Sequence, residues 1–317
     1  MDTPNRIATD STTPARLFSR RSGLLAGLGL LGTAALSGCS PQPPATGASA
    51  SISPGIWSGK LAELEKDLGV ALSVCAFAEG GSTLGYRAEE PFAMCSTFKT
   101  ILVAALIDKY AHSEGYWETE VPVDPAKLLD YAPIAKKFAG RSMTITQLCD
   151  ATARYSDNTT ANLLIEQLGG TSAVTAFAAA KGAPNTRLDR IEPEMSEAKP
   201  GDDRDTSTAK DLAGIYNSLL LGDGLDLTGQ AMLRSWMLRN TTSAQKMRAA
   251  IPKDAELADK TGSGGYGAMN DVGVIFRKGK PPVTLAILSR GVNAAPDTDG
   301  NAEAIVRATE VTLAALG

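Results

Sequence analysis

A serine and a lysine stand three residues apart at the start of a long apolar segment, as Ser96 and Lys99. The segment runs from Thr100 to Ile107 and predicts a helix, on which residues three apart share one face. A serine becomes a strong nucleophile when a neighbouring base takes its proton, and a neutral lysine can be that base. The same pattern also suits a helix N-cap serine followed by a solvated lysine, so the pair does not decide its own role.

Three further polar motifs follow along the chain. Ser156-Asp157-Asn158 lies between two predicted helices, Glu192-Pro193-Glu194 lies in a charged loop, and Lys260-Thr261-Gly262 lies at the end of a predicted strand. Taken alone, each motif suits a structural role, namely an interhelical turn with its own cap, a solvated loop and a hairpin turn. Taken together and in this order after Ser96, the motifs point to one site.

The ordered set of four motifs resembles that of the class A serine β-lactamases, which belong to the penicillin-recognising serine hydrolases. The resemblance extends from about Gly59 to the C-terminus. It implies that the chain hydrolyses the β-lactam amide of penicillins and related antibiotics through a serine acyl-enzyme and so gives antibiotic resistance. It implies no metal and no organic cofactor.

The resemblance, together with the chemistry of a strained amide, assigns the catalytic roles. Ser96 would be the nucleophile, and both Lys99 and Glu192 are candidate bases for acylation, between which the sequence does not choose. Ser156 would pass a proton to the leaving nitrogen with the assistance of Lys260. The acyl-enzyme ester must then be attacked by water, for which the Glu192 carboxylate is the natural base.

The same resemblance predicts how the substrate is bound. The backbone N–H groups of Ser96 and Ser263 would form the oxyanion hole. The hydroxyl groups of Thr261 and Ser263, with Lys260, would hold the substrate carboxylate. The other expected substrate contacts are Gly262 of the Lys-Thr-Gly motif, Asn158 for the side-chain amide, and Tyr131 at the mouth of the cleft unless it packs at a helix edge.

The sequence departs from the family pattern at two positions. Ser196 stands where family members usually have an asparagine that helps to hold the deacylating water, and a hydroxyl offers fewer hydrogen bonds than an amide. Met269 stands where many members carry an arginine that binds the substrate carboxylate. We expect Lys246 to replace that arginine in part, as a point charge and not as a bidentate fork.

Residues 190–205 predict a compact Ω loop, because the segment is crowded with charge and carries Pro193 and Pro200. Arg190 and Asp205 bracket the loop, and we expect them to form its closing ion pair. The resemblance implies a cis peptide bond between Glu192 and Pro193. Loss of the Arg190 side chain is expected to loosen the loop and slow deacylation.

Two other functions use the same nucleophile. One is a D-alanyl-D-alanine peptidase acting on peptidoglycan, against which Glu192 argues because related transpeptidases lack this loop glutamate. The other is a β-lactam-binding sensor that is acylated but not regenerated. Complete turnover by a substoichiometric amount of protein would exclude the sensor.

The periodicity of the remaining sequence predicts an α/β fold. Short apolar strands are predicted at 70–77, 83–86, 256–260, 271–276 and 283–289, with helical segments between them. Strands at both ends of the chain predict one discontinuous domain, which is an antiparallel sheet of about five strands flanked by helices. We assign 55–90 and 237–317 to this sheet domain and 91–236 to an inserted all-α domain.

Composition excludes several function classes. The chain has 317 residues and a formal net charge of −4, which argues against nucleic-acid binding. Its one histidine, His112, excludes a site built on several histidines. Nothing in the sequence demands more than a monomer. Three cysteines follow Cys39, in apolar contexts, and we expect no disulfide among them.

The N-terminal segment resembles an export signal. Ser19-Arg20-Arg21-Ser22 precedes a glycine-rich apolar stretch, as in twin-arginine signals. The stretch ends in Leu36-Ser37-Gly38-Cys39, which resembles the lipobox of bacterial lipoproteins of the actinobacterial type. We therefore expect 1–38 to be a signal peptide, Cys39 to carry a lipid, and 39–54 to be a flexible tether. The protein would lie in the cell envelope outside the cytoplasmic membrane and meet the membrane only through that lipid, whereas plain secretion would leave Cys39 free.

Overall fold

The computed structural model describes residues 53–78 and 82–317 of the chain. These described residues form one compact unit. The predicted signal peptide and Cys39 lie outside the described residues. Helix α1 begins at Pro54, the last residue of the predicted tether, so the folded part starts one residue earlier than the sequence indicates.

The centre of the compact unit is a five-stranded antiparallel sheet in the order β2-β1-β9-β8-β7. Its strands come from both ends of the sequence, as predicted, so the first and last segments of the chain are neighbours in the sheet. Strand β1 pairs with β9 from Val70 opposite Gly291 to Ala78 opposite Val283. The strands are β1 Val70–Ala78, β2 Thr83–Tyr86, β7 Glu256–Ser263, β8 Met269–Phe276 and β9 Val283–Gly291.

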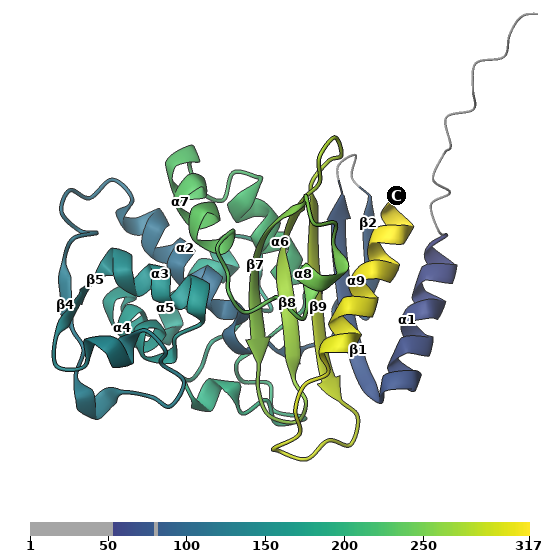
Figure 1. The fold of residues 1–317 in the computed structure, drawn as a ribbon, viewed down its shortest axis with the longest axis horizontal. Helices are drawn as coiled ribbons and strands as arrows, with labels where there is room; N and C mark the ends of the chain where they lie inside the picture. The colour runs from purple at the N-terminus through teal and green to yellow at the C-terminus, as the bar shows by residue number, and fades with distance from the viewer. Residues whose placement is uncertain (1–52, 79–81) are drawn as a thin grey trace, which may run out of the picture. The chain divides into compact units, whose positions relative to one another are not determined.

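Helices cover both faces of this sheet (Figure 1). Helices α1, α8 and α9 lie on one face, where their apolar residues and those of the strands form one hydrophobic cluster. A larger cluster joins the opposite face to the helical part of the molecule. Both faces are therefore buried, which is why the strands read as continuous apolar runs. The first group of helices is α1 Pro54–Leu68, α8 Met247–Ala250 and α9 Ala302–Leu316.

The helical part is built around α2, Phe98–Tyr110, whose residues from Phe98 to Ile107 are all buried. A helix that is apolar on every side belongs in the middle of a core, and α2 contacts α3, α4, α5 and α7. Ser96 lies in the 3₁₀ turn Cys95–Thr97 that leads into α2. The helix predicted from the Thr100 run is confirmed, and it begins two residues before that run.

The other helices agree with the sequence periodicity. A capping box begins α3, because the Thr144 hydroxyl accepts from the N–H of Gln147 and the Gln147 side chain accepts from the N–H of Thr144. In the described part of the chain no single helix is long and apolar enough to cross a membrane, and α4 with α5 passes that test only as a pair bent by 76°. These helices are α3 Ile145–Tyr155, α4 Asn158–Leu168, α5 Thr171–Ala180, α6 Ala209–Leu220 and α7 Leu227–Met237.

Several short elements have no counterpart among the predicted ones. Elements of two to four residues are too short to show a period, so sequence reasoning misses them. Two of the strand pairs hold loops of the helical part, with β3 next to β6 and β4 next to β5. The elements are β3 Phe92–Ala93, β4 Glu120–Pro122, β5 Ser142–Thr144, β6 Thr206–Ser207 and the 3₁₀ turns Pro125–Lys127, Ala135–Phe138 and Glu194–Ser196.

Strand β7 is longer than predicted. The expected strand 256–260 continues to Ser263, which pairs with Met269, so the Lys-Thr-Gly motif lies inside the sheet and not in a turn. Gly262 is needed for this path, because a Cβ there would lie 2.9 Å from the Met94 carbonyl oxygen and 3.2 Å from the Ser96 nitrogen. Close approach between two backbones is a common reason for glycine in a strand.

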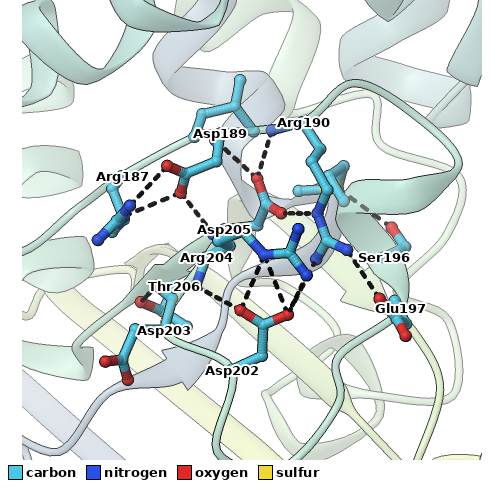
Figure 2. A network of polar contacts seen from close by, with 12 residues as sticks. Arg187, Asp189, Arg190, Ser196, Glu197, Asp202, Asp203, Arg204, Asp205 and Thr206 are labelled. Carbon is cyan, nitrogen blue, oxygen red and sulfur yellow. Dashed lines mark hydrogen bonds and ion pairs between the residues drawn. The ribbon is translucent and has the colours of Figure 1, made fainter.

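The Ω loop is closed by a buried carboxylate (Figure 2). Asp205 accepts from the backbone N–H groups of Asp189 and Arg190 and from the Arg190 Nε at 2.6 Å. Arg190 also pairs with Glu197 at 2.7 Å. The predicted Arg190–Asp205 ion pair and the cis peptide bond at Glu192–Pro193 are both confirmed.

We predict that Arg190→Met lowers the free energy of unfolding by about 3 kcal/mol, because removing one partner leaves a buried charge without its counter-charge. The Asp205 side chain is only 1% exposed. Arg204→Met is the matched control, because this arginine belongs to the same cluster, is 51% exposed and pairs with Asp202. It should cost no more than about 0.5 kcal/mol. Equal urea midpoints for the two variants would contradict the closing role of Arg190.

Candidate active site

A cleft of about 510 Å³ brings the four motifs together. Its walls come from the Ser96 turn, the α3–α4 connection, the Ω loop and strand β7. Sequence reasoning missed Pro193, Thr241 and Thr242 as lining residues. The cleft contains ten of the predicted site residues, namely Ser96, Tyr131, Ser156, Asn158, Glu192, Ser196, Lys246, Thr261, Gly262 and Ser263.

The nucleophile candidate contacts a carboxylate. Ser96 Oγ donates to Glu192 Oε1 at 3.3 Å, and the same oxygen lies 3.0 Å from Lys99 Nζ. Among the hydrogen bonds of the described residues, none joins Ser96 Oγ directly to Lys99 Nζ. The expected pairing of serine with lysine is thus mediated by Glu192.

Lys99 is completely buried beneath the cleft. Its ammonium group donates to the Ser156 carbonyl oxygen at 2.9 Å and to Asn158 Oδ1 at 2.5 Å. Burial lowers the pKa of Lys99, because a charged group loses its hydration, while the nearby Glu192 carboxylate acts in the opposite direction. The proton of Lys99 is therefore held less tightly than that of a lysine in water.

The Glu192 carboxylate is held from both sides. Ser196 Oγ donates to Glu192 Oε2 at 3.0 Å. The side chain of Asn162 binds the Glu192 backbone, accepting from its N–H at 3.0 Å and donating to its carbonyl oxygen at 2.8 Å. Sequence reasoning missed Asn162. It stands four residues after Asn158 on α4, so the helical period would have put both on one face.

Ser156 connects the two lysines of the site. It ends α3 in the left-handed conformation, with φ 57°, and its hydroxyl accepts from Lys260 Nζ at 2.9 Å and lies 3.5 Å from Lys99 Nζ. Lys260 also donates to the Thr261 carbonyl oxygen at 2.8 Å. Burial, assisted by the positive charge of Lys99, lowers the pKa of Lys260 to about 7.

Tyr131 lies at the rim of the cleft. It is 53% exposed and lines the cavity, so the alternative of a packed helix-edge tyrosine does not describe it. Its carbonyl oxygen accepts from the N–H of Asn158 at 3.0 Å. Asp157 holds the same loop, because its carboxylate accepts from the N–H groups of Ile134 and Ala135. The Ser-Asp-Asn motif thus fixes one wall of the cleft.

The opposite wall carries hydroxyl and ammonium groups. The hydroxyls of Thr242 and Thr261 lie 2.6 Å apart, and Lys246 Nζ donates to the Thr242 carbonyl oxygen at 3.1 Å. With buried Lys260 behind them, these groups make this wall suitable for an anion. His112 takes no part in the site, because it is exposed and contacts Asp226.

Two observations bear on metal or thiol chemistry. Within residues 53–78 and 82–317, no group of three His, Cys, Asp or Glu side chains is arranged to hold a metal ion. Cys75, Cys95 and Cys149 are buried free thiols. Burial raises the pKa of Cys95, next to the nucleophile, to about 12. Its thiol is therefore neutral and unreactive at neutral pH.

Comparison with known proteins identifies the family. Residues 60–315 match the model of the β-lactamase enzyme family. The chain is 35% identical to β-lactamase AST-1 of Nocardia asteroides, over 98% of this chain and 100% of that protein. It is 44% identical to β-lactamase CTX-M-25 of Escherichia coli, over 71% of this chain and 78% of that protein.

Solved structures agree with these relatives. The β-lactamase from Desulfarculus baarsii is similar with a TM-score of 0.81 and 40% identity, covering 84% of this chain and 99% of that one. The class A β-lactamase from Mycobacterium abscessus is similar with a TM-score of 0.78 and 40% identity, covering 82% and 99%. With Ser96 and Lys99 each in contact with Glu192, the chain belongs to the β-lactamase family as a class A serine β-lactamase that hydrolyses β-lactam antibiotics.

Proposed function

We propose that Ser96 Oγ attacks the β-lactam carbonyl carbon while Glu192 accepts its proton. The contact of 3.3 Å between Ser96 Oγ and Glu192 Oε1 supports this choice, since a general base must lie within reach of the proton that it takes. Lys99 contacts the same carboxylate oxygen at 3.0 Å, so it holds the base in place beside the nucleophile. Of the two bases that the sequence leaves open, Glu192 is the one in contact with the nucleophile.

The oxyanion that forms on attack is bound by the backbone N–H groups of Ser96 and Ser263. The close packing of β7 on the nucleophile turn, for which Gly262 leaves room, supports this assignment. When the amide bond breaks, Ser156 Oγ donates its proton to the β-lactam nitrogen. Its hydrogen bond from Lys260 Nζ, at 2.9 Å, makes that proton easier to release.

The proton that Glu192 takes from Ser96 passes through Lys99 to Ser156, along contacts of 3.0 and 3.5 Å, and replaces the proton that Ser156 gives to the nitrogen. Deacylation then uses the same carboxylate. Glu192 removes a proton from the water that attacks the acyl-enzyme ester and returns it to Ser96 Oγ as the ester bond breaks, which frees Ser96 for another cycle. The Ser196 hydroxyl donates to Glu192 Oε2 at 3.0 Å, so it orients the base. Ser196 therefore supports the base itself, in addition to any hydrogen bond that it offers to the water.

We predict that Glu192→Gln abolishes sustained turnover and slows both acylation and deacylation. The amide cannot accept a proton, so each step should fall by about 10² to 10⁴-fold. The measurement is nitrocefin hydrolysis at substoichiometric protein, with mass spectrometry of the acyl-enzyme. Glu194→Gln is the matched control, because this carboxylate lies two residues away in the same loop and is exposed. Sustained turnover by Glu192→Gln would rule out its role as the base.

The substrate carboxylate is proposed to bind Thr261, Ser263 and Lys260, with Lys246 beside them. All but Lys260 line the cleft, and Lys260 lies buried behind Thr261. Asn158 would bind the substrate's side-chain amide, and Tyr131 would contact the substrate at the rim. Lys246 offers a point charge and not a fork, so it orients an anion less strictly than an arginine would.

The charge of Lys260 gives this proposal a pH dependence. The pKa of Lys260 is lowered to about 7, so the side chain is a cation below that pH and becomes neutral as the pH rises through it. We predict that KM for benzylpenicillin rises between about pH 6 and pH 9, and that this rise is absent in Lys260→Arg, which stays charged. The same rise in both proteins would assign the effect to another group.

We also propose that the protein is exported and anchored by a lipid on Cys39. The support is the twin-arginine pattern and the lipobox-like Leu36-Ser37-Gly38-Cys39. A lipid chain adds about 0.8 kcal/mol of membrane affinity per buried CH₂. Expressed in an actinobacterium, the wild-type protein should therefore partition into the detergent phase of a Triton X-114 extract, and Cys39→Ser should not. Aqueous partitioning of both proteins would favour plain secretion.

A further inference from the structure

Two carboxyl side chains are buried side by side in the sheet next to the cleft. Asp259 of β7 is 1% exposed and Asp271 of β8 is 0% exposed. In the register of these strands Asp271 lies opposite Thr261, and Asp259 lies opposite Gly273. Side chains alternate between the two faces of a strand, so both carboxyls lie on the Thr261 face, and Lys260 points to the other.

The position of Gly273 makes room for the pair. A Cβ at Gly273 would lie 2.6 Å from the Asp259 Cβ, which no pair of side chains tolerates. The glycine therefore allows Asp259 to lie flat against the neighbouring strand. Burial of the two acids is consequently a property of the sheet itself and not of a mobile loop.

One buried carboxyl oxygen of the pair has no hydrogen-bond donor among the described residues. Asp259 Oδ2 accepts from Asn240 Nδ2 at 2.8 Å, and Asp271 Oδ2 accepts from the Met247 N–H at 3.0 Å. Asp271 Oδ1 is buried and has no donor among the described residues. Two ionised carboxylates in contact would repel each other. One proton shared between them removes this repulsion and gives Asp271 Oδ1 a hydrogen bond.

Charge and burial around the pair agree with one bound proton. Burial, and then the negative charge of Asp259, raise the pKa of Asp271 well above its usual range. Burial also raises the pKa of Asp259, while the positive charge of Lys260 opposes that rise. Lys246 acts in the same way on Asp271, but more weakly than burial. The buried oxygen without a donor, Asp271 Oδ1, is the one that carries this proton.

We propose that Asp271 is a neutral carboxylic acid that donates to Asp259, and that this acid pair is a positioning device for the substrate-carboxylate wall of the cleft. The pair holds both ends of the segment 240–247, Asp259 through Asn240 and Asp271 through Met247. The inference rests on the function proposed above, because it concerns the groups assigned to the substrate carboxylate.

A continuous chain of contacts leads from the acid pair to the cleft. Asn240 Oδ1 accepts from the N–H of Thr242 at 3.0 Å and from its hydroxyl at 2.8 Å. The Thr242 hydroxyl lies 2.6 Å from that of Thr261, and the Thr242 carbonyl accepts from Lys246. The acid pair therefore determines where two of the anion-binding groups lie, although neither acid lines the cleft.

The test compares Asp271→Asn with Asp271→Leu, which have similar volumes. An asparagine can donate to Asp259 and accept from Met247 as a neutral acid does, so KM and kcat for benzylpenicillin should stay within about twofold of wild type. Leucine makes neither of these two contacts, so the wall should shift and lose about one hydrogen bond to the charged substrate carboxylate. KM should then rise by about tenfold while kcat changes little. If Asp271→Leu has a lower melting temperature but an unchanged KM, the pair has only a structural role and the proposal is wrong.

Two further measurements keep the proposal testable if Asp271→Leu does not fold. Asn240→Ala interrupts the same series of hydrogen bonds at a partly exposed residue and should also raise KM. The infrared difference spectrum of wild type minus Asp271→Asn should contain the C=O band of a buried carboxylic acid, which shifts in D₂O. An unchanged KM in Asn240→Ala or a missing band would each refute the proposal.

Direct variants of the wall separate this inference from the proposed function. Thr261→Val and Lys246→Ala should each raise KM for benzylpenicillin without any change in the acid band. An unchanged KM in both would show that the assignment of the substrate carboxylate is wrong. A raised KM in both, together with an unchanged KM in Asp271→Leu, would show that the acid pair does not position them.

Discussion

A completely buried ammonium group, that of Lys99, is the constraint on which the site depends. A cation in a dry core is costly unless oxygen atoms replace its hydration. Here the replacements come from the Ser156 carbonyl, Asn158 and Glu192. Each of these residues also lines the cleft, so hydrogen bonding of one buried group brings the Ser96 turn, the α3–α4 connection and the Ω loop together.

Of the residues whose oxygen atoms contact Lys99, Glu192 of the Ω loop is the farthest from it in the sequence. The loop therefore needs contacts of its own to hold it in position. Glu192 lies 93 residues after Lys99 in the sequence, and no helix or strand carries it to the site. The loop is fixed by Asp205 at its base and by Asn162, which binds the backbone of Glu192 near its start. The stability of the loop and the position of Glu192 are thus coupled, because this carboxylate is only as well placed as the loop that carries it.

Much of this arrangement could be predicted from the sequence, where the local pattern is long enough. Helix α9 and the five central strands follow from periodicity, and the Arg190–Asp205 pair follows from the loop's charges. The remaining features depend on the register between strands and on the close approach of segments that are far apart in the sequence. The extension of β7 through Gly262 requires its neighbours, and the Asp259–Asp271 pair exists only because two strands meet in one register. The roles of the site residues remain predictions that the proposed variants test.

The pairing of the first strand with the last has a consequence for biosynthesis. Strand β1 cannot enter the sheet between β2 and β9 until residues 283–291 have left the ribosome. Such long-range pairing makes folding slow, because the ends of a long chain must meet first. The turn that carries Ser96, made in the first third of the chain, therefore waits for Lys260 and the last quarter before the cleft is complete. A nascent chain carries Ser96 long before it carries strand β7, which forms the opposite wall of the cleft.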